Sequence, residues 1–163
     1  MKVKLIESNG SRGNPGLSGG GGLVWDRHGH FIFGYSCFFG NLTSLHVELK
    51  AMLFGVRQCL LCGYDALHVE TDSLVLANMI QGTSACPWEL QGELEELLQY
   101  RHSFQAISHC YKEANKPVDQ LANSGVDLQE TCTYDSLASL PGMVRGDVRL
   151  DSLGYPNFRT RIY

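Results

Sequence analysis

Four consecutive glycines, Gly19 to Gly22, stand directly before the apolar run Leu23-Val24-Trp25. Glycine tracts also occur in flexible linkers, but here the apolar residues follow at once. Inside a strand, glycine marks a place where another part of the chain approaches the backbone closely, because no Cβ stands in the way. The tract therefore predicts a tightly packed strand and not a linker.

The first 40 residues predict three antiparallel strands. Residues 2–8 alternate polar and apolar side chains, as a strand does, and residues 9–16 are rich in turn-forming types, which predicts a structured loop. The glycine tract opens the second strand. Residues 27–30 form a hairpin turn into a third, aromatic strand at residues 31–39.

The next part of the chain alternates helices and strands. Apolar residues at spacings of three and four between residues 45 and 62 predict an amphipathic helix that ends at Gly63. The later elements are a strand at 67–71, helices at 74–80 and 88–100, a strand at 106–111 and a helix at 116–126. This order predicts an α/β fold with a five-stranded mixed sheet, three antiparallel strands followed by parallel ones, flanked by helices. Residues 1–128 form one domain, and residues 129–163 are expected to be an irregular C-terminal tail.

Composition narrows the class of protein. A length of 163 residues suits one domain, and no run of about 18 apolar residues is present to span a membrane. The N-terminus lacks the apolar core of a signal peptide, so we expect an intracellular protein, nuclear or cytoplasmic, with no membrane partner. The net charge of −4 argues against strong nonspecific binding to nucleic acid. Cys59 and Cys62 form a CxxC inside an apolar helical pattern, where buried thiols are favoured over zinc or redox chemistry.

Four polar residues fall where elements end or begin. Asn9 ends the first strand, Glu48 lies in the first turns of the long helix, Asp72 ends the fourth strand and Asp119 opens the last helix. Ligands of open α/β sheets gather at such positions. Hard cations such as Mg²⁺ prefer oxygen ligands, and two of them can hold both the attacking and the leaving oxygen of a phosphodiester.

Four motifs around these residues resemble those of the type 1 ribonuclease H domain, in the same order over about residues 2–126. They are Asn9-Gly10-Ser11 with Gly13-Asn14-Pro15-Gly16, Val47-Glu48-Leu49-Lys50-Ala51, Val69-Glu70-Thr71-Asp72-Ser73, and residues 113–122 with Asn115 and Asp119-Gln120-Leu121-Ala122. The short link before the last helix and the segment 140–157 are similar to plant ribonuclease-H-like domains of retrotransposon-derived reverse transcriptase proteins.

The resemblance implies a site and a substrate. Glu48, Asp72 and Asp119, with Asn9, would be catalytic residues and metal ligands for Mg²⁺, or Mn²⁺ in its place. The substrate would be the RNA strand of an RNA–DNA hybrid, in contact with residues of the first loop and the start of the long helix. These substrate-binding candidates are Gly10, Ser11, Gly13, Asn14 and Ser44.

The sequence departs from the ribonuclease H pattern at Asn9, where the family has its first metal-binding aspartate. An amide supplies one neutral oxygen, so we expect weaker metal binding and a loss on the order of 4 kcal/mol or more of transition-state stabilisation if one ion is lost. Glu7, on the same strand face, is a possible substitute carboxylate, although a solvated position is favoured. His46 is a possible contact of substrate or metal, with a solvated residue again favoured, and a structural role is favoured for His109.

Two classes of function follow. The leading hypothesis is a Mg²⁺-dependent endonuclease that cleaves RNA–DNA hybrids, impaired at Asn9. The alternative is a catalytically inactive, domesticated domain that binds nucleic acid or a protein partner as a regulator. An exonuclease of a related fold is disfavoured, because its Asp-x-Glu on the first strand is absent.

Overall fold

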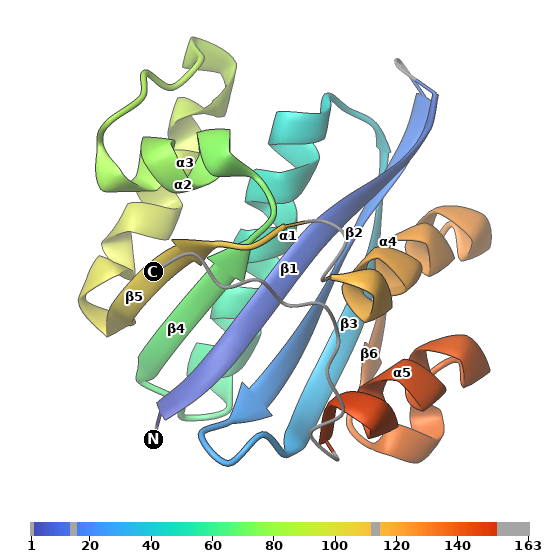
Figure 1. Ribbon diagram of the computed structural model, residues 1–163. Coiled ribbons are helices and arrows are strands. Elements are labelled where there is room, and N and C mark those ends of the chain that lie inside the picture. Colours follow the sequence, from blue (N-terminus) through green and yellow to red (C-terminus); the bar gives the residue numbers. More distant parts are fainter. Residues whose placement is uncertain (1, 14–15, 112–114, 153–163) are drawn as a thin grey trace.

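Three long antiparallel strands form the centre of a mixed sheet in the computed structural model, which describes residues 2–13, 16–111 and 115–152 (Figure 1). The strand order is β5-β4-β1-β2-β3-β6, with β4 parallel to β1 and β5 parallel to β4. The strands are β1 (Lys2–Gly13), β2 (Gly16–Asp26), β3 (Phe31–Asn41), β4 (Ala66–Thr71), β5 (Phe104–His109) and β6 (Cys132–Tyr134). The predicted α/β class and the arrangement of its first five strands are confirmed.

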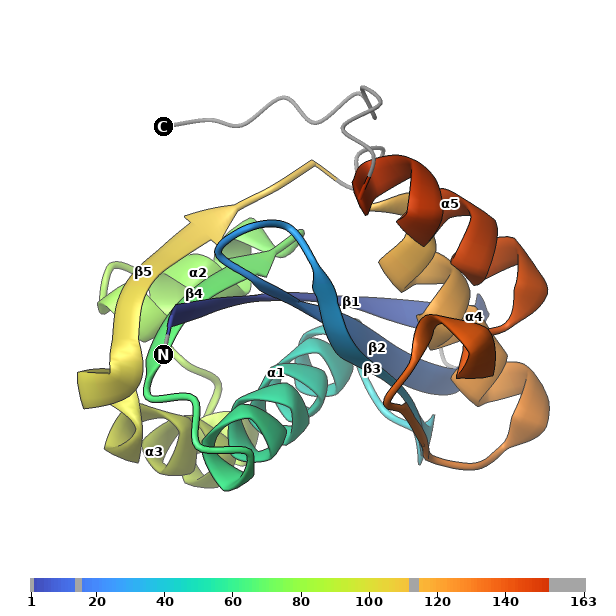
Figure 2. The same cartoon turned by 90° about the horizontal axis from the view of Figure 1, so that it is seen from below.

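Helices cover both faces of the sheet, with α1 and α3 on one side and α4 and α5 on the other (Figure 2). The helices are α1 (Ser44–Leu61), α2 (Leu74–Gln81), α3 (Gln91–Gln99), α4 (Lys116–Leu128) and α5 (Gly142–Ser152), with short 3-10 turns η1 (Trp88–Leu90), η2 (Arg101–Ser103) and η4 (Leu137–Ser139). Each face has its own apolar core. The first contains Leu5, Tyr35 and Met52, and the second contains Ile6 and Leu121.

The glycine tract lies in β2, where both helix layers come close to the strand. A Cβ on Gly20 would run into Ala51 of α1, and a Cβ on Gly21 would lie 2.7 Å from the backbone nitrogen of Ala122 in α4. In both places the added carbon would lie closer to its neighbour than a normal van der Waals contact allows. The prediction of a strand with close neighbours on its backbone is therefore confirmed.

Local capping explains where α1 and α2 begin. The side chain of Thr43 accepts a hydrogen bond from the His46 amide, and Ser73 does the same for the Leu76 amide, so α1 and α2 start at these side chains. The structure moves other boundaries. The turn-rich segment at residues 9–16 is mostly strand, because β1 continues to Gly13 and pairs with β2. The predicted helix at 88–100 begins with the separate turn η1.

The segment after residue 128 is a further part of the fold, which corrects two predictions. β6 pairs antiparallel with β3 at Ser36 and Cys132, so the sheet has six strands and not five. In α5 and just before it, Leu140, Val144 and Val148 are buried in the second core against α4. The expected irregular tail is thus structured through residue 152, and residues 153–163 lie outside the described part of the chain.

Over the described ranges, none of the helices combines the length and the apolar character that crossing a bilayer requires. The cysteines of the CxxC differ in exposure, since Cys59 is buried and Cys62 is exposed, and both are free thiols. Burial raises the pKa of the Cys59 thiol to about 12. The buried-thiol interpretation therefore holds for Cys59 but not for Cys62.

Candidate active site

Two acidic residues far apart in the chain meet at the first strand. The hydroxyl oxygen of Ser8, on β1, lies 2.7 Å from Asp72 Oδ2 and 2.5 Å from Asp119 Oδ1. Asp72 follows β4, which runs parallel beside β1, and Asp119 lies in the first turn of α4. A hydroxyl carries a single proton, so Ser8 donates to one of the two carboxylates at a time. The expected convergence of Asp72 and Asp119 is present in the structure.

The residue between these carboxylates is Ser8, to which the sequence analysis gave no role, and the role of Asn9 as a metal ligand stays a prediction. The Asn9 amide instead donates a hydrogen bond to the Ser44 carbonyl at 3.3 Å, at the start of α1. Successive residues of a strand point to opposite faces of the sheet, so Ser8 faces α4 and Asn9 faces α1. The side chain at position 9 links β1 to α1.

Asn115 holds the start of α4 against β1. Its side chain is buried and donates a hydrogen bond to the Glu7 carbonyl at 3.3 Å, while its own carbonyl accepts from the Asp119 amide at 3.0 Å. This positions the helix turn that carries Asp119. The sequence motif included Asn115 without giving it a role, and an amide directly before a helix is the signal that could have indicated one.

The side chain of Glu7 is completely buried on the α1 side of β1, so the prediction of a solvated position is wrong. Neither carboxyl oxygen has a well-formed hydrogen bond to any described residue. Burial raises the pKa of Glu7 well above its usual value, and the nearby charges of Glu48, Asp72 and Asp119 raise it further, in that order. The Thr71 hydroxyl offsets part of the shift in this pKa.

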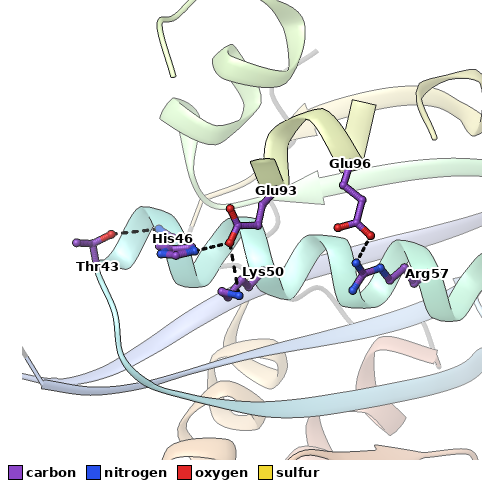
Figure 3. A network of polar contacts seen from close by, with 6 residues as sticks. All are labelled: Thr43, His46, Lys50, Arg57, Glu93 and Glu96. Carbon is purple, nitrogen blue, oxygen red and sulfur yellow. Dashed lines mark hydrogen bonds and ion pairs between the residues drawn. The ribbon is translucent and has the colours of Figure 1, made fainter. Parts of the chain in front are cut away.

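The first turns of α1, where Glu48 lies, are fixed by α3 (Figure 3). His46 Nε2 lies 2.8 Å from Glu93 Oε1, and Lys50 Nζ lies 3.6 Å from the same oxygen. The hydrogen bond from His46 is the main cause that lowers the pKa of Glu93. His46 is therefore a link between two helices, with its side chain largely covered, and not the solvated residue that was favoured. Two turns further along α1, Arg57 pairs with Glu96.

His109 fixes the end of β4 from the neighbouring strand. Its Nε2 lies 3.1 Å from the carbonyl oxygen of Asp72, and its ring packs edge-on against Tyr111. This contact agrees with the structural role favoured for His109.

The predicted substrate-binding residues are spread along the β1–β2 hairpin and the start of α1. Gly10 lies against α4, where a Cβ would come within 3.2 Å of the Asn123 backbone nitrogen. Ser11 and Gly13 are paired with β2, and Ser44 is the first residue of α1. Asn14 lies outside the described residues. Their contact with a substrate stays a prediction.

The side chains supply the chemistry for a hard divalent cation, but not an assembled site. Carboxylates of Glu48, Asp72 and Asp119 and the Ser8 hydroxyl are oxygen donors, and the orphaned carboxyl of Glu7 is a group that a cation would stabilise. Within residues 2–13, 16–111 and 115–152, however, no three His, Cys, Asp or Glu side chains are grouped closely enough to hold a metal ion. The donor set fits such an ion in kind, and its side chains would have to turn to bind it.

The sheet has the strand order β5-β4-β1-β2-β3-β6, and the acidic residues Asp72, after β4, and Asp119, in α4, meet at β1. Together these features define a ribonuclease-H-like domain. Comparison with solved structures supports the fold. The ribonuclease H1 of Halobacterium salinarum superposes with a TM-score of 0.69 at 22% identity, over 78% of this chain and 98% of that one. The LC11 ribonuclease H1 in complex with an RNA/DNA hybrid gives a TM-score of 0.73 at 21% identity, over the same shares of the two chains.

A family model described as reverse transcriptase-like matches residues 7–125, and the chain belongs to this family. A protein of Arabidopsis thaliana named "putative ribonuclease H protein" is 29% identical over 159 residues, which is 93% of this chain and 24% of that protein. A bifunctional protein of Mycobacterium tuberculosis is 26% identical over 137 residues, 78% of this chain and 36% of that protein. The chain thus spans about a quarter to a third of the length of these relatives. The ribonuclease H resemblance and the plant relationship inferred from the motifs are confirmed.

Proposed function

We propose that the chain binds RNA–DNA hybrids as a ribonuclease-H-type domain and that its Mg²⁺-dependent cleavage of the RNA strand is impaired at Asn9. The observation that carries the proposal is the meeting of Asp72 and Asp119 at Ser8 of the first strand, directly before Asn9. The matched family and the likeness to ribonuclease H1, solved with a hybrid in one case, support the substrate class.

In this proposal the chain's own groups bind and orient the substrate. Glu48, Asp72 and Asp119 would hold Mg²⁺, or Mn²⁺, which when bound activates a water and stabilises the leaving oxygen. Asn115 keeps Asp119 at the first strand, and the His109 contact keeps the Asp72 backbone in place. Substrate contacts would come from the β1–β2 hairpin, where Gly10, Ser11, Gly13 and Asn14 lie in sequence, and from Ser44.

Charge is the physical reason for the impairment. Two divalent cations a few ångströms apart repel each other, and carboxylates between them reduce this repulsion. The amide of Asn9 brings an oxygen but no negative charge. The second cation is then held more weakly, and loss of one electrostatic element of this kind costs a nuclease about 10²–10³ in rate.

The test is a cleavage and binding assay on a labelled RNA–DNA hybrid, with Mg²⁺ and with Mn²⁺. We expect the unchanged chain to bind the hybrid and to cleave it slowly, and Asn9→Asp to cleave about 10²–10³ times faster. Asn9→Gln is the matched control, because it changes the same side chain without adding a charge and should not raise the rate. Adding Asp72→Asn to Asn9→Asp should remove the gain. An Asn9→Asp variant that folds and binds the hybrid but cleaves no faster than the unchanged chain would contradict the assignment.

A second candidate is a catalytically inactive domain that regulates by binding nucleic acid or a protein. The net charge of −4 and the missing carboxylate at position 9 favour it. Hybrid binding without cleavage in the unchanged chain and in Asn9→Asp, with folding intact by circular dichroism, would select this function.

A further inference from the structure

Three exposed apolar side chains lie near Asp72, at the end of β4. Leu74 and Val75, in the first turn of α2, come directly after Asp72 and Ser73 and are 56% and 53% exposed. Tyr111, which follows β5, is 43% exposed. Every other large exposed apolar side chain of the described residues stands alone on its element, namely Leu17, Leu61, Trp88, Leu128 and Met143. Single apolar residues are normal on a surface, whereas a group beside one acidic residue indicates a contact surface.

Tyr111 is held beside Asp72 by backbone and side-chain contacts. The Cys110 amide donates a hydrogen bond to the Thr71 carbonyl at 2.9 Å, so the chain that leaves β5 runs along the end of β4 (Figure 1). His109 Nε2 lies 3.1 Å from the Asp72 carbonyl oxygen, and the Tyr111 ring packs edge-on against His109 with 5.6 Å between the ring centroids. The ring is therefore supported on one side by His109, and its remaining surface is open at the candidate site.

Charge gives this chain little grip on phosphates. The net charge is −4, and the basic side chains of Lys50, Arg57 and Lys116 are each paired with an acid. A nucleic-acid backbone also presents sugar rings between its phosphates, and these rings offer C–H groups and oxygens. A tyrosine side chain suits such a surface, because its apolar ring can pack on the sugar while its hydroxyl reaches an oxygen.

We propose that Tyr111, Leu74 and Val75 form a contact surface, the apolar rim, that binds the sugar rings of a nucleic-acid backbone beside Asp72. The inference rests on the proposed function and names a part of its binding surface. Packing against sugars neutralises no phosphate, so the affinity it adds does not depend on salt. A chain with an acidic balance gains affinity in this way without clustered lysines and arginines.

The test measures binding of a labelled RNA–DNA hybrid by fluorescence anisotropy at several salt concentrations, within the time in which the unchanged chain leaves the hybrid intact. Tyr111→Ala should weaken binding roughly tenfold, the order of an aromatic contact with a nucleotide. Tyr111→Phe keeps the ring and should bind within about twofold of the unchanged chain. Both variants should keep the slope of log Kd against log salt, because no phosphate contact is lost.

Val75→Ala is a second variant that preserves the fold. Val75 is exposed on a helix, and alanine is the better helix former, so the variant should stay folded. It should weaken hybrid binding by about two- to threefold, because two methyl groups leave the contact. Leu61→Ala is the matched control, since Leu61 is exposed at the end of α1 opposite to Glu48, and it should bind the hybrid as the unchanged chain does.

The inference and the proposed function can fail separately. If the unchanged chain binds the hybrid, and Tyr111→Ala and Val75→Ala bind it as tightly as Leu61→Ala does, the inference is overturned and a protein becomes the better candidate for the apolar rim. A lower salt slope in Tyr111→Phe would also contradict it, because the hydroxyl would then act on a phosphate. If the unchanged chain binds no hybrid, the proposed function itself is refuted.

Discussion

Replacing Gly21 by alanine is expected to destabilise the protein and to disturb the candidate site together. A Cβ at position 21 would lie 2.7 Å from the Ala122 nitrogen and 2.9 Å from Leu121 Cβ, both of which belong to the body of α4. Ordinary contacts of a Cβ begin at 3.4 Å, so α4 has to recede by about 0.7 Å. Asp119 belongs to this helix, so the same displacement lengthens the 2.5 Å distance between Ser8 Oγ and Asp119 Oδ1 to the limit of a hydrogen bond.

The expected cost follows from overpacking. Forcing one extra carbon into a close-packed region costs about 1–3 kcal/mol, of which the smaller unfolded-state entropy of alanine returns about 0.4–1 kcal/mol. A net loss of about 1 kcal/mol lowers the melting temperature of a domain this size by roughly 2–4 °C. Urea unfolding monitored by circular dichroism measures the free energy of unfolding directly.

Gly92→Ala is the matched control for this substitution. Gly92 lies on the exposed side of α3, and a Cβ there would meet no atom within 4 Å. Alanine is the better helix former, so the variant should gain about 0.5–1 kcal/mol. The close approach of α4 to β2 would be refuted if Gly21→Ala were as stable as the unchanged protein, or if both variants gained stability.

Three further outcomes are expected. Leu140→Ala should lower the free energy of unfolding by about 2–5 kcal/mol in urea, because Leu140 is 2% exposed in the second core; a change below about 0.5 kcal/mol would mean that the segment after residue 128 is not part of the fold. At pH 8, Cys62 should react with a thiol reagent in the folded protein, whereas Cys59, with its pKa raised to about 12, should react only after unfolding; equal rates would contradict its burial. The pKa of Glu93 is lowered by His46, so the ionised Glu93 stabilises the fold above the ordinary glutamate pKa of about 4.3, and this stabilisation is lost as pH falls through the lowered pKa. Glu93→Gln should therefore flatten the dependence of the free energy of unfolding on pH below about 5, and an unchanged slope would exclude the contribution.

Much of the fold could be predicted from local signals. The spacing of apolar residues in α1, the capping by Ser73 and the glycine tract in β2 are consequences of short-range geometry, and each appears in the structure. The segment after residue 128 was predicted differently, although Leu140, Val144 and Val148 recur at helical spacing. Glycine, proline and charged residues between these positions obscured the helical pattern in the sequence. In the structure the three side chains pack against the apolar side of α4.

The sequence by itself determined the family, the order of strands and helices, and the acidic residues Asp72 and Asp119 at the ends of their elements. It did not determine that the Ser8 hydroxyl lies between them. A shift of one residue along a strand exchanges the two faces of the sheet, and the face that receives Asp119 is set by the side on which α4 packs. The burial of Glu7 was decided in the same way. A carboxyl on a strand is solvated or enclosed according to whether a helix lies over its face of the sheet, and the face of Glu7 is covered by the distant α1.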